Sequence, residues 1–421
     1  MSNQFTKEVR IMFDDMLEGF DDALTTAKLA RKFRPASDVE MQRIGDQVWI
    51  PAPNIAASYD GFDQTSNFQD FTDMVVPVSI GYHKSSNGKM SAKDLRDPVQ
   101  LANYAKAAKQ KLSSDINLAL FNTVALQGSQ VVKRTTAPTG FDDIAAADAQ
   151  LTEQGVSTMD RAMLLSPRSY NAMASNLAKP QTSGLRETMT AFQKSYLGDV
   201  AGFETYKNDQ SFRLAAAGGG ATTVNGANQY WVPKATSVAA TGETANVDNR
   251  YSSLAVTAAN YANIKPGDAF TITGVNAVHM ITKQDTGQLQ TFRVIGKPAA
   301  GVILVAPAII SGGGATKAEL EYKNVSATPA NGATLTWLNT VTADVNPFFV
   351  KDNLLLIPGS FTVKSEDGWK SMTATTDLGI AITYVEQGNI NDLSVKFRWD
   401  IDFGTALLNP QMAGIIEFNQ S

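Results

Sequence analysis

The sequence predicts an α+β fold that is interrupted by an all-β insertion. A single apolar stripe runs through residues 97–127 at helical spacing, and residues 393–401 alternate between apolar and polar side chains. The stretch 215–345 is poor in charge, rich in Ala, Gly, Thr and Val, and contains six short β-type runs. A chain of 421 residues is long enough for two or three domains that each bury a core.

Residues 4–34 are predicted to form one amphipathic helix that ends before Pro35. Acidic side chains gather in its first half and basic side chains in its last turns, which complements the helix dipole. Its apolar stripe consists of Phe5, Val9, Met12, Phe13, Met16, Phe20 and Leu24.

A short strand at 47–53 is followed by a stretch at 54–90 with little helical period. Part of this stretch alternates as a strand does, and Pro77 restricts such a strand to the edge of a sheet. We expect this edge to be unpaired in an isolated chain and to pair with a neighbouring chain. Its alternating residues are Met74, Val76, Val78, Ile80 and Tyr82.

The helix at 97–127 has the clearest local signals of the chain. Asp97 suits the N-cap, Pro98 the first turn and Gly128 the C-terminal stop. About 30 residues give a helix of roughly 45 Å, which indicates a long strut lying on a sheet. Its stripe consists of Leu101, Ala105, Ala108, Leu112, Ile116, Ala119 and Leu120.

The remaining elements are predicted from short periodic runs. Residues 142–214 mix helices and strands, with a strand near 160–166 and a helix at 169–178. The insertion is predicted to be a barrel or sandwich with strands at 251–258, 269–275, 290–296, 302–309, 318–325 and 334–338. Later strands are predicted at 353–357, 379–386, 393–401 and 413–418.

Composition excludes several function classes. With a formal charge of −5 and a pI near 5.3, the chain lacks the basic excess of a nucleic-acid-binding protein. It has no cysteine, which excludes disulfides and thiolate metal sites. The polar N-terminus does not resemble a secretory signal, and no apolar run reaches 18 residues, so we expect no membrane contact.

No residue pattern predicts a catalytic, cofactor-binding or metal site. The two histidines, His83 and His279, lie in separate predicted domains and are interpreted as incidental. Asp400 and Asp402 could serve as acid–base or metal groups, but their alternation with Trp399 and Ile401 favours a solvated polar face of a strand. We therefore expect no enzyme and no cofactor.

Several short motifs together resemble the coat proteins of podoviruses of the phage P22 type. Their order and spacing over essentially the whole chain give the resemblance, since none is specific alone. They are Met41-Gln42-Arg43 before Trp49-Ile50-Pro51, Lys93-Asp94-Leu95-Arg96-Asp97, Val200-Ala201-Gly202-Phe203, Asn246-Val247-Asp248-Asn249-Arg250-Tyr251, Ile264-Lys265-Pro266-Gly267-Asp268, Asp377-Leu378-Gly379-Ile380, Gln387-Gly388-Asn389-Ile390 and Asn409-Pro410.

The resemblance implies a Hong Kong 97-type capsid fold and a major capsid protein of a tailed bacteriophage. The implied parts are an N-arm (1–35), a peripheral-domain strand (36–53), an extended β loop (54–90), a peripheral segment with the spine helix (91–130), a first axial part (131–220), an inserted β-barrel (221–345) and the axial remainder returning to the peripheral domain (346–421).

The implied function is assembly of pentamers and hexamers into an icosahedral shell in the bacterial cytoplasm, where the shell becomes that of the virion. Implied partners are further copies of the chain, a scaffolding protein, a portal protein and enclosed double-stranded DNA that is not read by sequence. The acidic side chains Asp14, Asp15 and Glu18 are candidate scaffold contacts, with a solvated helix face as the alternative.

The relatives carry a charged loop early in the insertion that clasps a neighbouring capsomer. The matching stretch here, 230–246, has only Lys234 and Glu243, so a strong charge clasp is in doubt. Three other functions stay open: a nanocompartment shell around a cargo enzyme, a sugar-binding adhesin, and a hydrolase with an unfamiliar site.

Overall fold

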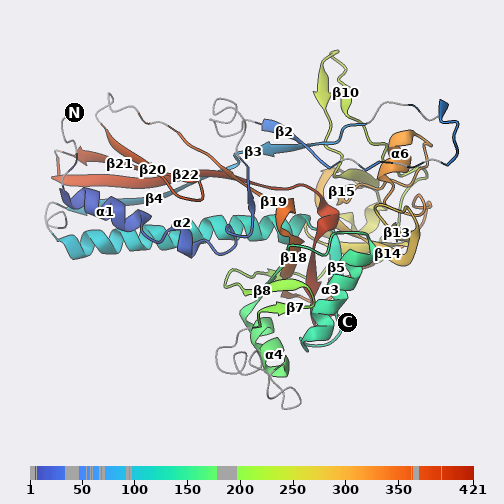
Figure 1. The fold of residues 1–421 in the computed structure, drawn as a ribbon, viewed down its shortest axis with the longest axis horizontal. Helices are drawn as coiled ribbons and strands as arrows, with labels where there is room; N and C mark the ends of the chain where they lie inside the picture. The colour runs from blue at the N-terminus through green and yellow to red at the C-terminus, as the bar shows by residue number, and fades with distance from the viewer. Residues whose placement is uncertain are drawn as a thin grey trace. The chain divides into compact units, whose positions relative to one another are not determined.

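The computed structural model describes residues 5, 7–33, 47–53, 55–56, 58, 60–65, 68, 72–91, 94, 97–177, 197–361, 363, 369–389 and 391–421. The chain forms two compact units. Unit 1 consists of Met1–Val48, Val78–Phe121 and Leu354–Ala406, and unit 2 of Trp49–Pro77, Asn122–Asn353 and Leu407–Ser421. The ribbon colours of Figure 1 show segments from distant parts of the sequence side by side within each unit, and both contain helices and strands. The predicted α+β class is confirmed.

Unit 1 is built on a long, mainly antiparallel sheet of order β1-β19-β22-β21-β20, with β4 paired to β22 as well. The strands are β1 (Arg31–Lys32), β4 (Tyr82–Ser91), β19 (Leu354–Pro358), β20 (Lys370–Thr375), β21 (Ala381–Asn389) and β22 (Ser394–Leu407). The strand predicted at 393–401 is therefore β22, and it continues six residues further. Residues Leu354–Ala406 pack in unit 1, and the chain returns to unit 2 at Leu407.

Two helices, α1 (Lys7–Leu17) and α2 (Pro98–Gln127), lie along one face of this sheet (Figure 1). Aromatic side chains make the contact. Phe13 of α1 stacks on Trp399 at 5.8 Å between ring centroids, and Tyr104 of α2 meets Phe397 at the same separation. Because Phe397 and Trp399 are two residues apart on β22, both helices cover the same side of the strand.

The helix predicted at 4–34 is too long. α1 ends at Leu17, and Gly19 follows with a φ of +65°, a left-handed conformation that ends helices. The chain then forms the 3₁₀ turn η1 (Asp21–Ala23). Asn117 of α2 holds the next turn, because its side chain accepts from the Thr26 and Ala27 amides and donates to the Ala23 carbonyl. The predicted stop at Pro35 lies outside the described residues.

The apolar stripe predicted for residues 4–34 is buried in spite of this shortened helix. The turns after Leu17 keep Phe20 and Leu24 on the core side, which a continuous helix would also have done.

The boundaries and the stripe predicted for α2 are confirmed. The Asp97 carboxylate accepts from the Val99 amide at 3.0 Å, as an N-cap does. All seven stripe residues are buried. Gly128 follows the helix for a steric reason: a Cβ there would come within 2.9 Å of the backbone of Ala413 and Gly414.

Unit 2 contains a six-stranded mixed sheet of order β5-β23-β18-β6-β8-β7. The strands are β5 (Gln130–Lys133), β6 (Arg161–Leu165), β7 (Asp199–Val200), β8 (Phe203–Lys207), β18 (Asn346–Val350) and β23 (Ala413–Glu417). Helices α3 (Phe141–Glu153) and α4 (Pro167–Leu177) share one apolar core with it. Arg161 is buried, and it donates to the α3 carbonyl of Asp148 and pairs with the Asp148 carboxylate.

A second sheet of unit 2 is antiparallel, with the order β12-β15-β14-β13-β16 and a core of its own. Its strands are β12 (Ser252–Ala255), β13 (Ala269–Val278), β14 (Asp285–Ala299), β15 (Val302–Ala306) and β16 (Leu335–Trp337). Isolated bridges pair Thr223 with Thr334 and Val224 with Val256, so one segment lies against both edges. Five of the six predicted strands are confirmed, and the barrel domain itself stays a prediction.

The sixth predicted strand, 318–325, is wrong. These residues begin with a helix, α6 (Lys317–Tyr322). The Thr316 hydroxyl accepts from the Glu319 amide, and the Glu319 carboxylate accepts from the Thr316 amide, which is a capping box. This reciprocal cap favours the helix over the strand suggested by alternation.

The smaller elements complete the described part of the chain. They are β2 (Gln47–Pro51) with β3 (Val75–Ser79), β9 (Arg213–Leu214) with β17 (Ala343–Asp344), the hairpin of β10 (Thr236–Val238) and β11 (Thr244–Asn246), and the 3₁₀ turns η5 (Ala258–Asn263), η6 (Lys351–Asn353) and η8 (Pro410–Met412).

Candidate functional site

A connected group of charged side chains in unit 1 lies on β22 and β4. His83 is directly across from Asp402 in the strand register, and its Nδ1 lies 2.5 Å from the Asp402 carboxylate. Its Nε2 lies 3.4 Å from Asp400 and 3.2 Å from Arg398. Arg398 donates two hydrogen bonds of 2.6 Å to Asp400, and this bidentate pairing raises the pKa of Arg398.

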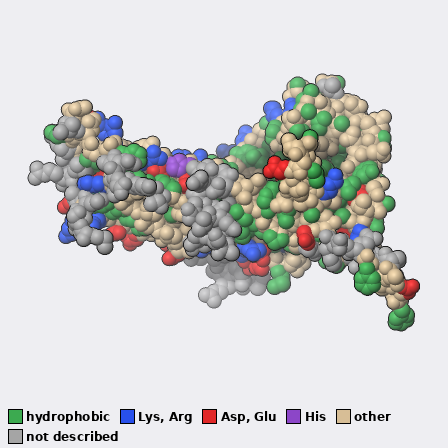
Figure 2. All heavy atoms as spheres, turned by 90° about the horizontal axis from the view of Figure 1, so that it is seen from above, with side chains coloured by type: hydrophobic (Ala, Val, Ile, Leu, Met, Phe, Trp, Pro, Cys, Tyr) green, Lys and Arg blue, Asp and Glu red, His purple; other side chains and the backbone are tan. Residues whose placement is uncertain are grey.

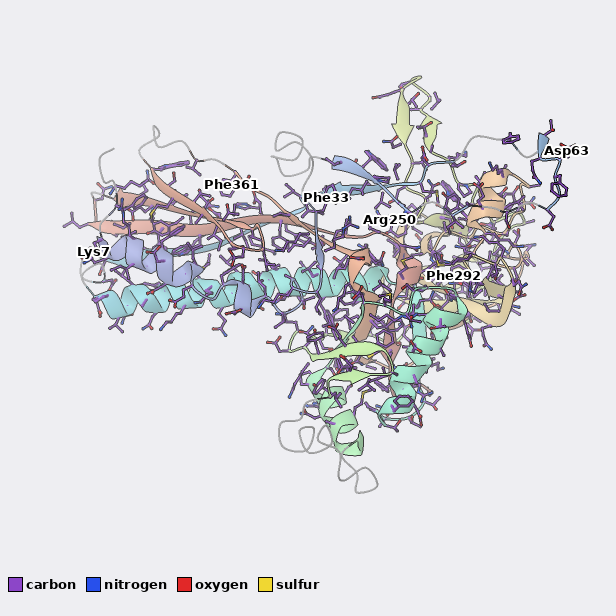
Figure 3. All side chains as sticks on the ribbon, viewed as in Figure 1. Lys7, Phe33, Asp63, Arg250, Phe292 and Phe361 are labelled. Carbon is purple, nitrogen blue, oxygen red and sulfur yellow. The ribbon has the colours of Figure 1, made fainter. Side chains whose placement is uncertain are left out.

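The interpretation of Asp400 and Asp402 as a solvated polar face is wrong, since both are buried. Alternation does place them opposite Trp399 and Ile401, away from the helices. The segment after β19 covers that side instead: the Gly359 amide donates to the Asp402 carbonyl, and the ring of Phe361 meets His83 edge-on at 5.8 Å (Figure 3).

Both histidines have hydrogen-bonding partners. His83 belongs to the charged group above, and Nδ1 of His279 accepts from the amides of Ile281 and Thr282. Within the described residues, no group of three or more His, Cys, Asp or Glu could hold a metal ion. The arrangement at β22 balances buried charge, and each carboxylate has its own cationic or imidazole partner.

Replacing His83 by Ala is expected to lower the stability of the chain by about 1–3 kcal/mol, because the buried Asp402 carboxylate loses its imidazole partner. Thermal unfolding of the unassembled chain measures this. The control is His279→Ala, which removes the other imidazole and leaves Asp402 paired. An unchanged melting temperature for His83→Ala would show that Asp402 finds another donor.

Unit 2 buries a second charged group between β14 and β23. Arg293 and Glu417 are both almost fully buried. Arg293 donates to the Ala125 carbonyl at 2.7 Å, while its Nε and Nη1 and both Glu417 oxygens have no hydrogen-bond partner among the described residues. Burial raises the pKa of Glu417 to about 7 and lowers that of Arg293 to about 10.

The candidate scaffold contacts lie on and just after α1. Asp14 and Glu18 are exposed and Asp15 is partly buried. Lys109 of α2 donates to the backbone carbonyls of Asp15 and Glu18 and so caps the end of α1. Asp14 and Asp15 lie in the last turn of α1, and Glu18 follows the helix directly.

The candidate edge strand is not unpaired in the isolated chain. β3 pairs with β2, and Tyr82 begins β4, which pairs with β22 along its length. Val76, Val78 and Ile80 are buried. The sheet of β2 and β3 has two strands in the described part of the chain, so the pairing of the other edge of β3 with a neighbouring chain stays a prediction. Met74 packs against the cluster of Ala308, Ile310 and Tyr322. Because its own chain buries these side chains, β3 exposes less apolar surface to a neighbouring subunit.

Lys234 and Glu243 are both exposed, but the structure does not bring them together as one charged patch. Lys234 precedes β10 at the foot of the hairpin, where its backbone is held by the Asn249 side chain. Glu243 lies in the turn between β10 and β11. The hairpin carries these charges at opposite ends, and all its strand residues are exposed.

Sequence reasoning missed an exposed aromatic turn at residues 60–65 (Figure 3, near Asp63). Phe62 is 110% exposed, although hydrogen bonds order the turn around it. Gln64 donates to the carbonyls of Asp60 and Gly61, and Asp63 accepts from the Thr65 amide and hydroxyl. The Thr65 hydroxyl lowers the pKa of Asp63.

In the space-filling view, hydrophobic and acidic side chains lie together on a segment that projects at the lower right (Figure 2). Phe68 is a further exposed aromatic in the same part of the sequence, at 85%. The alternation at 74–82 predicted an interaction site at a different place. The sequence Asp–Gly–Phe–Asp, which is typical of a turn, is the local signal for the turn at 60–65.

None of the helices in the described part of the chain combines the length and the apolar character needed to cross a bilayer.

Comparison with known proteins shows the family to which the chain is similar. The model of a family described as P22 coat protein, gene protein 5, matches residues 1–418. A structure titled "Mycobacterium phage Che8" is 11% identical over 93% of this chain and 90% of that chain, with a TM-score of 0.48. "Capsid structure of the Cyanophage P-SCSP1u" is 12% identical over the same shares, with a TM-score of 0.41. "CUS-3 coat protein I-domain" is 39% identical over 28% of this chain and 96% of that chain, with a TM-score of 0.23.

Proposed function

The chain belongs to the P22 coat protein family, and from this premise we propose that it forms a closed icosahedral shell of pentamers and hexamers around a phage genome. Members of this family are phage coat proteins, which assemble into oligomeric shells. The match over residues 1–418 carries this function. It gives no support to the nanocompartment and adhesin alternatives.

The proposed parts of the subunit follow the resemblance. Residues 1–35 act as the N-arm, 54–90 as the extended loop and 221–345 as the inserted domain. The described part of unit 1, with α2 under the long sheet, supports a peripheral domain with a spine helix (Figure 1). The six-stranded sheet of unit 2 supports an axial domain.

Assembly from many modest contacts fits the surface of the chain. Each contact is weak enough to allow correction, while closure of the shell makes the sum of contacts effectively irreversible. The exposed turn at 60–65 supplies one such contact in this proposal, since aromatic side chains are enriched at the centres of interfaces. Its Phe62 gains a partner only when a second copy is present.

The proposed partners are a scaffolding protein, a portal protein and double-stranded DNA held without sequence-specific contacts. The formal charge of −5 supports the last point, since an acidic shell does not adhere to packaged DNA. Assembly in the host cytoplasm, followed by expansion through rigid-body rotation of the domains, completes the proposal.

Electron microscopy of the chain expressed alone and with its scaffolding protein tests the proposed function. Closed uniform shells in either preparation are the expected result. A monomer under both conditions would contradict shell assembly.

Replacing Asp14 and Asp15 together by Ala is expected to reduce the amount of scaffolding protein in the particles about twofold or more. Two carboxylates at the end of α1 lose their attraction for a basic partner surface. Quantitative gel densitometry of purified particles measures the ratio of scaffold to coat. The matched control replaces Asp142 and Glu153, which are exposed acidic residues on α3. Equal scaffold content in both double variants would remove Asp14 and Asp15 from the contact.

A further inference from the structure

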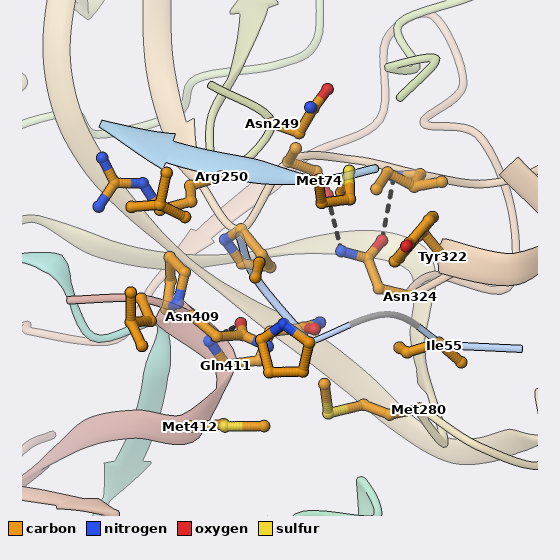
Figure 4. A pocket seen from close by; sticks show the side chains of 18 of the residues that line it. Ile55, Met74, Asn249, Arg250, Met280, Tyr322, Asn324, Asn409, Gln411 and Met412 are labelled. Carbon is orange, nitrogen blue, oxygen red and sulfur yellow. Dashed lines mark hydrogen bonds between the residues drawn. The ribbon is translucent and has the colours of Figure 1, made fainter. Parts of the chain in front are cut away.

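Unit 2 contains a cavity of about 130 Å³ where several segments distant in sequence meet (Figure 4). The lining consists of Ala52, Pro53, Ile55, 74–76, 249–250, Met280, Lys283, Pro307, Ala308, Ile310, 322–324 and 408–412. They come from the residues on either side of the turn at 60–65, from the region of the five-stranded sheet and from the segment that leads into β23. A molecule bound there would contact all of them at once.

The walls are mainly apolar. Ala308, Ile310 and Tyr322 form a buried cluster that Ile55 and Met74 complete on one side. Met280 and Met412 lie opposite Met74 in Figure 4, and Ile55 lies near Met280. Methionine side chains adapt to the shape of a guest. An apolar protein cavity of roughly 150 Å³ binds benzene, so the volume here suits one six-membered ring.

Most polar groups of the lining are already engaged by the protein. Arg250 pairs with Asp248 and donates to the Leu407 carbonyl. Asn324 donates to the Ala308 carbonyl and accepts from the Ile310 amide, as the dashed lines of Figure 4 show. These groups fix the walls and have little capacity left for a ligand.

Gln411 is the exception. It is 7% exposed, and its Nε2 has no hydrogen-bond partner among the described residues. Its backbone is held on both sides, because its amide donates to Asn409 and its carbonyl accepts from Gln130. A buried amide donor without a partner costs free energy, and an acceptor on a guest would satisfy it.

Lys283 adds positive charge to the lining. Its ammonium donates to the Lys323 carbonyl at 3.3 Å and keeps further donors. Burial lowers its pKa to about 8 although the charge of Glu321 opposes the fall, so Lys283 remains mostly protonated at neutral pH. A guest with a negatively charged oxygen is therefore favoured over a neutral one.

We propose that this cavity binds a small aromatic or branched aliphatic carboxylate. The hydrocarbon part occupies the apolar space between Met74 and Met280, and the carboxylate accepts from Gln411 Nε2 beside the Lys283 ammonium. Binding stabilises the folded chain in proportion to ligand occupancy. A bound guest would also contact both the residues next to β2 and β3, on either side of the turn at 60–65, and the segment 408–412.

Isothermal titration calorimetry of benzoate into the unassembled full-length chain tests the proposal. The expected result is saturable binding at one site per chain. Replacing Gln411 by Leu keeps the side-chain volume but removes the donor, and is expected to weaken benzoate binding about tenfold. The matched control is Gln288→Leu, which changes an exposed glutamine outside the lining and should leave binding unchanged.

A second variant tests the volume. Replacing Ala308 by Leu extends a side chain into the cavity and is expected to abolish benzoate binding, with circular dichroism reporting whether the variant folds. Titration heats that never saturate would overturn the proposal. Equal affinity of the wild-type chain and Gln411→Leu would also overturn it, and neither result bears on shell assembly.

Discussion

Replacing Glu417 by Gln is expected to abolish a pH dependence of roughly 3 kcal/mol in the free energy of unfolding between pH 4.5 and 7. The carboxylate is buried at the end of β23, and both of its oxygens lack a hydrogen-bond partner among the described residues. Desolvation raises its pKa from 4.5 to about 7 although Arg293 opposes the rise. Glutamine reproduces the neutral, protonated form of this side chain at every pH.

The direction of the effect follows from proton binding. Between pH 4.5 and 7 the folded chain holds a proton on Glu417 that the unfolded chain has released. The contribution of Glu417 to stability is therefore fully present below pH 4.5 and is lost as the pH rises through 7. Asp268, which also faces Arg293, has a raised pKa through burial and contributes in the same direction. Some pH dependence accordingly remains in the variant.

Thermal unfolding of the unassembled chain from pH 4.5 to 8.5 measures the effect as the difference between wild type and Glu417→Gln. The control is Glu153→Gln at an exposed position of α3, which should follow the wild type throughout. Parallel curves for Glu417→Gln and wild type would show that Glu417 titrates normally. Such a result would imply that water or a rearranged Arg293 solvates its carboxylate.

Local periodicity predicted most elements because it reports which face of an element is buried. The stripe of α2 is spaced so regularly that Leu101, Leu112 and Leu120 were expected on one buried face of the helix, and all three are buried. The strands β13, β15 and β22 were found for the same reason. Asp97 and Pro98 marked the start of α2 because capping depends only on adjacent residues.

Elements that depend on partners distant in sequence were not predictable in this way. The burial of Asp400 and Asp402 depends on Gly359 and Phe361, which return across the sheet after β19. The turns after α1 depend on Asn117, about 90 residues away. No local pattern carries this information.

The cavity beside Gln411 illustrates the same limit for sites. Its lining joins Ile55, Met280 and 408–412, and none of these parts of the sequence shows a pattern typical of a binding site. The wrong prediction at α6 has a different cause. The capping box of Thr316 and Glu319 was present in the sequence and indicated a helix, but the alternation of the neighbouring residues favoured a strand.

Replacing Phe62 by Ser is expected to reduce the yield of closed shells at least tenfold while leaving the melting temperature of the unassembled chain unchanged. The side chain is 110% exposed, so it contributes no packing to the isolated fold. Burying a phenylalanine in an interface stabilises each contact by about 1.5–3 kcal/mol. A shell repeats this contact in every subunit, so even a modest loss per contact is multiplied.

Sedimentation of the assembly mixture measures the fraction of chain in shells, and calorimetry of the unassembled fraction measures its stability. The matched control is Phe141→Ser at the start of α3, where the phenylalanine is 54% exposed and lies far in sequence from the 60–65 turn. Because Asp60 and Asp63 flank Phe62, the surface that receives it should combine apolar and basic groups. Shells should then be rescued more readily by Phe62→Leu, which restores apolar area, than by Phe62→Asp. Wild-type yields for Phe62→Ser would mean that the ordered turn faces solvent in the shell, and that the contacts closing it lie elsewhere on the subunit.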